Sequence, residues 1–417
     1  MKTKTFLAIA FAANAALTGI SNAQDNNWPG WRGADRTGVS QEKGLLQEWP
    51  EGGPKKLWSY EDAGMGYSSF SVVDGRLFTI GARDGVETLI CVDAKTGKEI
   101  WTTEFSGLFR NKWGDGPRSC PTVSGAHVYA MGGKGDLVCA NVSDGKVIWK
   151  KSMTDDFGGK VPGWGYTESP LVDGDKVICT PGGKGGALVA LNAKDGSTIW
   201  QSKEFTDGAQ YSSAIAIEHD GKRQYVQLVM KNLVGIDAET GALLWKSAWP
   251  GKTAVIPTPI YHDGHVYIAS GYGVGCKLVK LGAGNKVEDV YVNTLMINHH
   301  GGVILLDGHL YGYSDKNGWV CQDFKSGEQV WAEKRALRKG AIAYADGHFY
   351  CQGEGDGSIV LIEASSEGWK EKGRFVLDPQ TEQRADAGKI WTHPVICDGK
   401  LYLRDQELIH CYDIEAK

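Results

Sequence analysis

One short pattern recurs along most of this 417-residue chain and limits what the chain can fold into. The pattern is an Asp or Asn, three residues, a Gly, three residues and a Trp, and residues 237–245 show it most clearly. Each copy follows an apolar run and leads into a shorter one, which indicates a strand, a tight turn and a second strand. The first side chain accepts hydrogen bonds within its own turn, and the Gly supplies the positive φ that a short, bulged hairpin requires. The copies begin at Asp93, Asn141, Asn192, Asp237 and Asp323.

The spacing of the motif tryptophans predicts the architecture. Trp101, Trp149, Trp200 and Trp245 are 48, 51 and 45 residues apart, and Trp331 follows after a further 86 residues. A period of about 40–50 residues that carries about four short strands is typical of a β-propeller blade. The last gap is close to two periods, which indicates a degenerate copy between Trp245 and Trp331.

Eight such units account for the repeat, and the two ends of the chain share one of them. The eighth unit stops at Lys417 before any anchoring Trp, whereas the strand-like run at Trp58 lacks the strands that should precede it. Joining the two closes the ring and removes the exposed edge of an open array. We therefore predict an all-β, eight-bladed β-propeller over residues 55–417, with seven blades as the alternative if the weak fifth or seventh unit is misread. The innermost strands are expected to begin near Tyr67, Arg118, Thr167, Tyr211, Ile256, His299, Lys339 and Thr392.

The first residues have the pattern of a secretory signal peptide. A basic start, a short apolar stretch and small residues predict a signal over residues 1–23 with cleavage after Ala23, and hence a periplasmic or secreted protein. The alternative is an N-terminal anchor that stays uncleaved. Residues 24–54 carry few strand signals and are expected to form an extended segment whose Trp28 and Trp31 pack over the propeller.

Charge and hydropathy exclude some classes of partner. The net charge of −5 is mild and gives no reason to expect nucleic acid as a partner. No stretch after the signal is long and apolar enough to predict a transmembrane segment. We expect a monomer, because a closed ring of blades leaves no sheet edge to pair with a second copy.

The nine cysteines are expected to be mostly buried free thiols, although cysteines of exported proteins usually form disulfides. Cys91, Cys139, Cys321 and Cys411 fall at one equivalent position of their repeat units. Equivalent positions in neighbouring packed sheets lie about 10 Å apart. A disulfide needs Cα atoms within about 7 Å.

The repeated unit resembles the tryptophan-docking motif of the pyrroloquinoline quinone (PQQ) repeat family, whose eight-bladed propellers include quinoprotein alcohol dehydrogenases and BamB-like envelope scaffolds. The resemblance covers about residues 55–417. It implies that each motif tryptophan packs onto the neighbouring blade as a structural residue. These tryptophans are Trp58, Trp101, Trp149, Trp200, Trp245 and Trp331.

The resemblance is specific for the fold and much less so for chemistry, because one fold hosts many functions. The dehydrogenase branch implies PQQ held with calcium, an adjacent Cys-Cys pair at the cofactor and a catalytic Asp. No two cysteines are adjacent in this sequence, no haem-attachment Cys-x-x-Cys-His is present, and the calcium ligands have no clear counterpart. The lipidation Cys of the scaffold branch is absent too.

Three loops mix aromatic and charged residues in a way that strand turns do not need. They precede the second, third and eighth blades at residues 109–118, 161–168 and 384–393. Loops at the starts of innermost strands overhang one mouth of a propeller channel, so these groups are expected to ring that mouth and to suit a flat anionic ligand such as PQQ, or a sugar. The alternative is that the aromatic residues cap the core and the charges are solvated or paired. The candidate binding residues are Trp113, Asp115, Arg118, Trp164, Tyr166, Glu168, Tyr211, His299, His300, Lys339, Trp391 and His393.

Three of these candidates allow a finer expectation. Glu168 is a candidate metal ligand or general base if it is desolvated, and an ion pair with Arg118 is the alternative. His299 and His300 are adjacent on an expected strand and point to opposite faces, so one metal is not expected to bind both.

Three functions remain open from the sequence. The first, favoured narrowly, is an exported, non-catalytic propeller that presents its loops to an envelope or secreted protein partner or to a small ligand at the channel mouth. The second is a PQQ-dependent oxidoreductase that acts on alcohols or sugars. The third is a carbohydrate-binding propeller.

Overall fold

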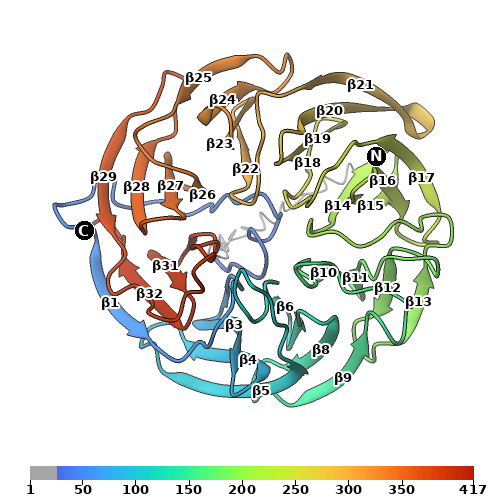
Figure 1. Cartoon of the computed structure of the whole chain (residues 1–417), viewed down its shortest axis with the longest axis horizontal. Coiled ribbons are helices and arrows are strands. Elements are labelled where there is room, and N and C mark those ends of the chain that lie inside the picture. Colours follow the sequence, from blue (N-terminus) through green and yellow to red (C-terminus); the bar gives the residue numbers. More distant parts are fainter. Residues whose placement is uncertain (1–25) are drawn as a thin grey trace, which may run out of the picture.

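The computed structural model describes residues 26–417, so the predicted signal peptide lies outside the described residues. Eight four-stranded antiparallel sheets are arranged around a central axis (Figure 1). The only helical element in the described part is a short 3-10 turn, η1 (Ala283–Asn285). The prediction of an all-β, eight-bladed propeller is confirmed, and the alternative of seven blades is wrong.

The first four blades follow the chain in order. Blade 1 holds β2 (Ser71–Val73), β3 (Arg76–Arg83), β4 (Val86–Asp93) and β5 (Glu99–Gly107). Blade 2 holds β6 (Thr122–Ser124), β7 (His127–Met131), β8 (Asp136–Asn141) and β9 (Val147–Ser152). Blade 3 holds β10 (Leu171–Asp173), β11 (Lys176–Cys179), β12 (Val189–Asn192) and β13 (Thr198–Gln201). Blade 4 holds β14 (Ile215–His219), β15 (Lys222–Leu228), β16 (Asn232–Asp237) and β17 (Leu243–Ala248).

The second half of the ring continues in the same way. Blade 5 holds β18 (Ile260–His262), β19 (His265–Ser270), β20 (Gly275–Gly282) and β21 (Lys286–Asn293). Blade 6 holds β22 (Val303–Leu306), β23 (His309–Ser314), β24 (Gly318–Asp323) and β25 (Gln329–Glu333). Blade 7 holds β26 (Gly340–Ala345), β27 (His348–Gly353), β28 (Ser358–Glu363) and β29 (Glu371–Val376). Blade 8 holds β30 (Val395–Cys397), β31 (Lys400–Asp405), β32 (Leu408–Asp413) and β1 (Lys55–Tyr60).

Strands from both ends of the chain close the ring. β1 pairs antiparallel with β32 at the outer edge of blade 8, and Trp58 lies opposite Cys411. The blue β1 and the red β32 lie side by side in Figure 1. The predicted closure is thus confirmed. Among residues 26–417, no helix is long and apolar enough to cross a membrane.

The motif turns form as their residues dictate. Asp237 accepts hydrogen bonds through Oδ1 from the backbone N–H of Glu239 and Thr240 and from Thr240 Oγ1, and Gly241 has a φ of 72°. The preceding tryptophan reaches across from its own blade and lies over this glycine. Five tryptophans donate through Nε1 to a carbonyl of the next blade's turn, at 3.0–3.1 Å: Trp58, Trp101, Trp149, Trp200 and Trp331.

Trp245 differs because blade 5 lacks a motif turn. Its Nε1 donates to Gln224 Oε1 of its own blade at 2.7 Å, although its ring still packs against Val279 and Leu281 of blade 5. In blade 5 the anchoring position is taken by Tyr291, whose hydroxyl donates to the carbonyl of Phe324 in blade 6 at 3.0 Å. The degenerate unit therefore keeps the contact with a different side chain.

The chain before β1 crosses the ring instead of lying only on its surface. Buried Arg36 donates to the carbonyls of Ser169 and Ala214 at 3.1 and 2.9 Å and to that of Pro170. Arg32, also buried, donates to the carbonyl of Val303 at 2.6 Å. The two guanidinium groups thus tie residues 26–54 to the innermost strand of blade 6 and to the loops that enter blades 3 and 4.

The cysteines behave as small apolar residues. All nine lie within residues 91–411 and are buried and free. Burial raises the pKa of their thiols, for example that of Cys321 to about 11. Cys91, Cys139, Cys321 and Cys411 lie opposite the motif tryptophans of their own blades, as the repeat register requires.

Candidate functional site

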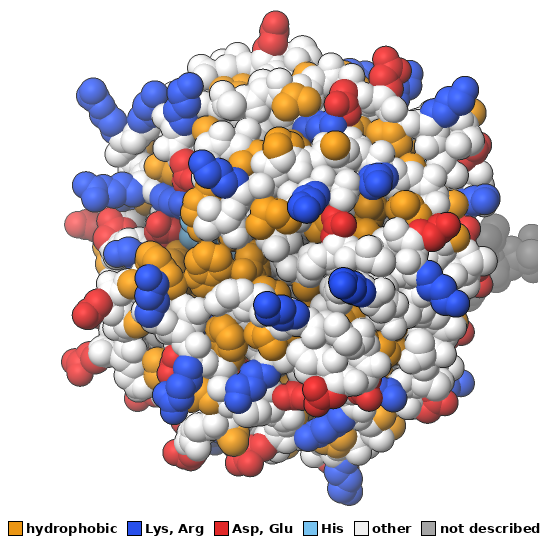
Figure 2. Space-filling model, turned by 45° about the vertical axis from the view of Figure 1, so that its right-hand side comes forward, with side chains coloured by type: hydrophobic (Ala, Val, Ile, Leu, Met, Phe, Trp, Pro, Cys, Tyr) orange, Lys and Arg blue, Asp and Glu red, His pale blue; other side chains and the backbone are white. Residues whose placement is uncertain are grey.

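Loops that lead into the innermost strands enclose a cavity of about 210 Å³ at one mouth of the ring. In the turned view of Figure 2, hydrophobic side chains gather in a hollow of the surface with lysine and arginine side chains around it. The cavity is lined by Trp31, Tyr67, Trp113, Arg118, Trp164, Thr167, Tyr211, Ser213, Ala254, Ile256, Tyr272, His299, His300, Trp391 and His393.

The innermost strands begin later than the sequence analysis expects. Tyr67, Arg118 and Thr167 lie four residues before β2, β6 and β10. They lie in the connecting loops, outside the strand pairing of the sheets, and their side chains line the mouth. The residues expected to start the strands therefore supply much of the cavity wall.

Aromatic rings form most of the wall. The Tyr67 hydroxyl donates to the Trp113 carbonyl at 2.6 Å, and its ring lies 4.9 Å from that of Trp391. Trp164 and Tyr211 make an edge-to-face pair at 5.7 Å. These contacts hold side chains from blades 1, 2, 3, 4 and 8 around one space.

The N-terminal segment supplies the floor of the cavity. Trp31 donates through Nε1 to Thr258 Oγ1 at 2.9 Å, and its ring lies 4.7 Å from the His393 ring. His393 donates through Nε2 to the carbonyl of His300 at 2.7 Å. Burial, with the nearby Arg32 charge, lowers the pKa of His393 to about 3, so this imidazole is neutral and acts as a donor.

Arg118 is the cation of the wall. Its guanidinium donates to the carbonyls of Gly114 and Gly116 at 2.6 Å each and lies over the rings of Tyr67 and Phe109, 5.2 and 5.3 Å from their centroids. Burial lowers its pKa from the ordinary value. No carboxylate of residues 26–417 forms an ion pair with Arg118.

A lysine sets the protonation state of His299. Lys339 donates to His299 Nδ1 at 2.6 Å and forms an ion pair with Asp315 at 2.8 Å. Burial and the Lys339 charge lower the pKa of His299 to about 4. Because Nδ1 accepts a hydrogen bond from the ammonium group, the neutral ring carries its own proton on Nε2. The ring stacks on His300 at 4.7 Å and meets Tyr272 edge to face at 4.4 Å.

His300 and Trp391 share one carboxylate behind the wall. Glu354 Oε2 lies 3.2 Å from His300 Nε2 and accepts from Trp391 Nε1 at 3.2 Å. Burial raises the pKa of Glu354 and lowers that of His300 well below its ordinary value. We take His300 as a neutral donor through Nε2 to Glu354.

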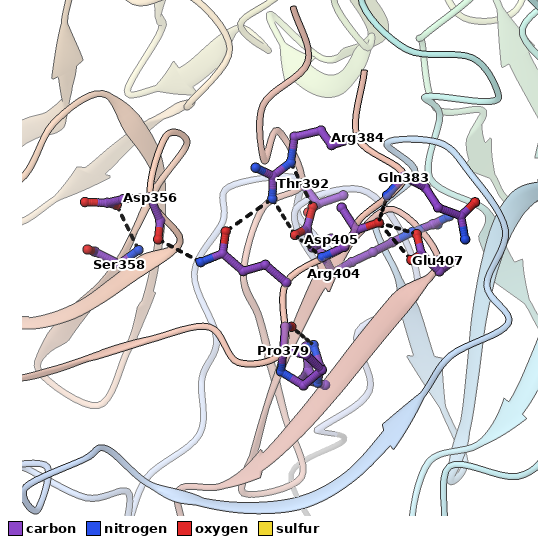
Figure 3. A network of polar contacts seen from close by, with 12 residues as sticks. Asp356, Ser358, Pro379, Gln383, Arg384, Thr392, Arg404, Asp405 and Glu407 are labelled. Carbon is purple, nitrogen blue, oxygen red and sulfur yellow. Dashed lines mark hydrogen bonds and ion pairs between the residues drawn. The ribbon is translucent and has the colours of Figure 1, made fainter. Parts of the chain in front are cut away.

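A polar network anchors the loop that carries Trp391 and His393 to the mouth. Arg384 pairs with buried Asp405 at 2.5 Å, as Figure 3 shows. Thr381 donates to Glu407 at 2.6 Å, and Thr392 donates through Oγ1 to the carbonyl of Arg404 at 2.7 Å. The loop between β29 and β30 is thus fixed to blade 8 at several points.

Four predicted site residues do not line the cavity: Asp115, Tyr166, Glu168 and Lys339. Asp115 accepts from the backbone N–H of Asn111 at 2.8 Å and shapes its own loop. Tyr166 is buried between blades 2 and 3 and donates to the carbonyl of Pro181 at 2.9 Å. Trp113 and Thr167, which lie within two residues of them in the sequence, do line the cavity, so the direction of each side chain depends on the path of the loop.

Glu168 is also buried away from the mouth. It accepts from Thr180 N and Oγ1 at 2.6 and 2.8 Å and from Gln227 Nε2 at 3.1 Å. Burial raises its pKa to about 7, and the hydrogen bonds from Thr180 and the charge of Arg36 oppose this rise. The expected pairing with Arg118 is wrong, because the neighbouring cation is Arg36 of the N-terminal segment.

Lys339 lies just behind the lining, whereas Trp113, Arg118, Trp164, Tyr211, His299, His300, Trp391 and His393 line the cavity. Sequence reasoning missed Tyr272, which projects from the turn between β19 and β20 with a φ of 56°. Its position between Gly271 and Gly273 is the signal that marks such a turn. Trp31 was expected to be structural, and it both packs and lines the site.

The fold and the docking contacts define an eight-bladed propeller of the PQQ-repeat class. The sequence profile of the family described as outer membrane protein assembly factor BamB matches residues 52–130 and 87–333, and the chain belongs to this family.

Known relatives include both scaffolds and enzymes. The chain is 24% identical over 379 residues to the outer membrane protein assembly factor BamB of Yersinia pestis, covering 84% of this chain and 86% of that protein. It is 24% identical over 361 residues to a quinoprotein ethanol dehydrogenase of Pseudomonas aeruginosa, covering 78% of this chain but only 51% of the dehydrogenase. The solved structure of BamB from Moraxella catarrhalis aligns with a TM-score of 0.60 at 15% identity and covers 87% of this chain and 98% of that one. This structural likeness shows the fold alone.

PQQ held with calcium does not fit the residues at the mouth. Calcium takes six to eight oxygen ligands, whereas Asp115 and Glu168 point elsewhere and Glu354 lies behind Trp391. No group of three His, Cys, Asp or Glu residues within 26–417 is placed to hold a metal ion. The cavity of about 210 Å³ is also smaller than the usual ligand pocket of about 300–1,000 Å³.

Proposed function

We propose that this protein is an exported, non-catalytic binding propeller that carries no quinone. Its binding site is the mouth cavity, and the loops around the cavity face the envelope partner expected of a BamB-like scaffold. Membership of the BamB family supports the scaffold role. The predicted signal peptide supports export.

The observation that carries this proposal is the chemistry of the cavity lining. Catalysis by proton transfer needs a group that can accept a proton from the bound ligand. Among the described lining residues, His299 has its proton on the free Nε2, and His300 and His393 use their Nε2 atoms in contacts within the protein. The lining therefore offers rings and donors for binding. Its remaining basic atoms are Nδ1 of His300 and of His393, and burial lowers the pKa of both imidazoles, which makes them poor proton acceptors.

The blocked axis of the ring supports the same conclusion. Arg32 and Arg36 tie the N-terminal segment to Val303, Ser169 and Ala214, and Trp31 closes the cavity from below. A ligand enters and leaves by the same mouth. This arrangement suits reversible binding.

A titration with PQQ tests the proposal. The signal-cleaved protein is titrated with PQQ, with and without calcium, while tryptophan fluorescence and dye-linked oxidation of alcohols and sugars are followed. We expect no saturable quenching and no oxidation. Saturable binding below about 10 μM, equivalent to about 7 kcal/mol, that is lost in Trp164→Ala, would support the oxidoreductase alternative.

A further inference from the structure

We propose that the mouth cavity binds one six-membered ring that carries a carboxylate, such as a hexuronate sugar. The proposal rests on the function proposed above and names the ligand class of the same site. Three features of the lining support it: its ring faces, its donors and its single cation.

The aromatic walls favour a flat or chair-shaped ring. Tyr67, Trp113, Trp164 and Trp391 come from four blades and line the same space, with Trp31 beneath them. Aromatic faces bind the apolar faces of ring-shaped ligands and leave polar substituents at the rim. The cavity of about 210 Å³ has room for one substituted ring.

The free polar groups of the lining are mainly donors. The indole N–H groups of Trp113 and Trp164 have no hydrogen-bond partner within residues 26–417, and neither does the Tyr272 hydroxyl. His299 keeps its Nε2–H, because Lys339 occupies Nδ1. A donor-rich lining is satisfied by a ligand rich in acceptor oxygens, since an unmatched buried donor costs about 1–3 kcal/mol.

Arg118 supplies the charge that selects a carboxylate. Its two bonds to Gly114 and Gly116 and its position over two rings hold the guanidinium in place before any ligand arrives. A guanidinium has more N–H donors than these two bonds use. No carboxylate of the described residues lies within ion-pair distance of Arg118, although Glu87 and Asp115 act on its charge from further away. A ligand carboxylate can therefore bind its unused N–H groups directly, and bidentate binding of a carboxylate by arginine is strong and directional.

The same features disfavour other ligands. A cationic ligand would meet the charges of Arg118 and, behind His299, of Lys339. A neutral sugar would use the rings and donors but leave Arg118 without an anion. A ring with a carboxylate uses all three features.

Calorimetric titration of the full signal-cleaved chain tests the inference with D-glucuronate, D-glucose, benzoate and choline as probes. We expect glucuronate to bind at one per chain and at least about 10-fold more tightly than glucose, because a charge-assisted pair is worth more than a neutral bond. Choline should not bind. If benzoate binds as tightly as glucuronate, the site recognises a ring carboxylate and also accepts an aromatic acid. If glucuronate binds and benzoate does not, the ligand is a sugar acid.

Variants distinguish a site at Arg118 from a general charge effect. Arg118→Met should remove the preference for glucuronate over glucose, whereas Arg110→Met, which removes an exposed charge from the same loop, should keep it. Since Arg118 also ties its loop, Trp164→Ala serves as a second variant and should weaken both sugars about 10-fold or more by loss of stacking. Unchanged melting temperatures verify folding.

Three outcomes would overturn the inference. One is equal affinity for glucose and glucuronate, another is tighter binding of choline, and the third is no binding of any ring carboxylate up to its solubility limit. In each of these cases the non-catalytic function stands if PQQ does not bind. Saturable PQQ binding with dye-linked oxidation would instead contradict the proposed function itself.

Discussion

Trp49 of the N-terminal segment packs directly on Gly373 of β29, and the backbone N–H of Trp49 donates to the carbonyl of Lys372 at 2.8 Å. Gly373 lies opposite Leu361 just before the register shift of blade 7, where other blades carry their anchoring tryptophan. A Cβ built on Gly373 would lie 2.6 Å from Cβ of Trp49. A tryptophan from more than 300 residues earlier thus fills the place of the missing anchor.

Trp49→Ala should destabilise the propeller strongly. Trp49 is buried against Tyr350 and Phe375, and removing a buried aromatic side chain costs about 3–5 kcal/mol. Urea unfolding measures this loss of free energy. Ile100→Ala on the exposed face of β5 is the control and should cost less than about 1 kcal/mol. Similar small costs for both variants would show that the segment does not support blade 7.

Glu168 should make the protein less stable as the pH rises. Its pKa is about 7 in the folded chain and about 4.3 when unfolded, so its stabilising contribution is full below about pH 4.3 and is lost as the pH rises through 7. Glu168→Gln should therefore gain up to about 3 kcal/mol relative to the unsubstituted protein between pH 4 and pH 8. Chemical unfolding at several pH values measures the difference. The exposed Glu239→Gln variant is the control, and its stability relative to the unsubstituted protein should not change with pH. If the stability of Glu168→Gln followed that of the unsubstituted protein at every pH, the raised pKa of Glu168 would be contradicted.

His299 should be neutral, with its proton on Nε2, throughout the physiological range. Its pKa of about 4 lies below the unfolded value of about 6.5, so its contribution is present above pH 6.5 and is lost as the pH falls through 4. Lys339→Met removes a nearby positive charge and should raise this pKa, although burial still keeps it below 6.5. Nitrogen NMR of labelled histidine measures both properties. The exposed Lys316→Met should leave the pKa unchanged, and an unchanged pKa in Lys339→Met would contradict the contact.

Arg36→Met should loosen the N-terminal segment. The substitution leaves the buried carbonyls of Ser169 and Ala214 without their side-chain donor, and each unsatisfied group costs about 1–3 kcal/mol. The Pro170 carbonyl keeps a hydrogen bond from Thr122 Oγ1 at 2.6 Å. Hydrogen exchange of residues 26–54 should then become faster. Substitution of the exposed Arg335 by Met is the control and should not change the exchange. Full protection of the segment in Arg36→Met would show that other contacts hold it.

The repeat made the fold predictable, because each blade must contact the next one in the same way. The side chains at equivalent positions therefore make equivalent contacts. Asp237, Gly241 and Trp200 meet as their spacing requires. The contact of Trp49 with Gly373 was not predictable, since it joins distant parts of the chain and leaves no periodic signal. Only the absence of a motif tryptophan in blade 7 hinted at it.

The site was predictable in its location and less so in its residues. Aromatic and charged loops before innermost strands pointed to the mouth, and Trp113, Trp164 and Trp391 lie there. Tyr166 and Glu168 alternate with mouth-facing residues but point between the blades. The loop backbone and Arg36 set the direction of these two side chains. Neither of them follows the blade repeat of the sequence.

The most direct test of the account is the absorbance spectrum of the mature protein after production with added PQQ and calcium and after gel filtration. The account predicts a spectrum of tryptophan and tyrosine alone, because the described residues at the mouth do not offer the oxygen ligands that would hold calcium with the quinone. A quinone band at one PQQ per chain would contradict it and would place the protein with the dehydrogenases.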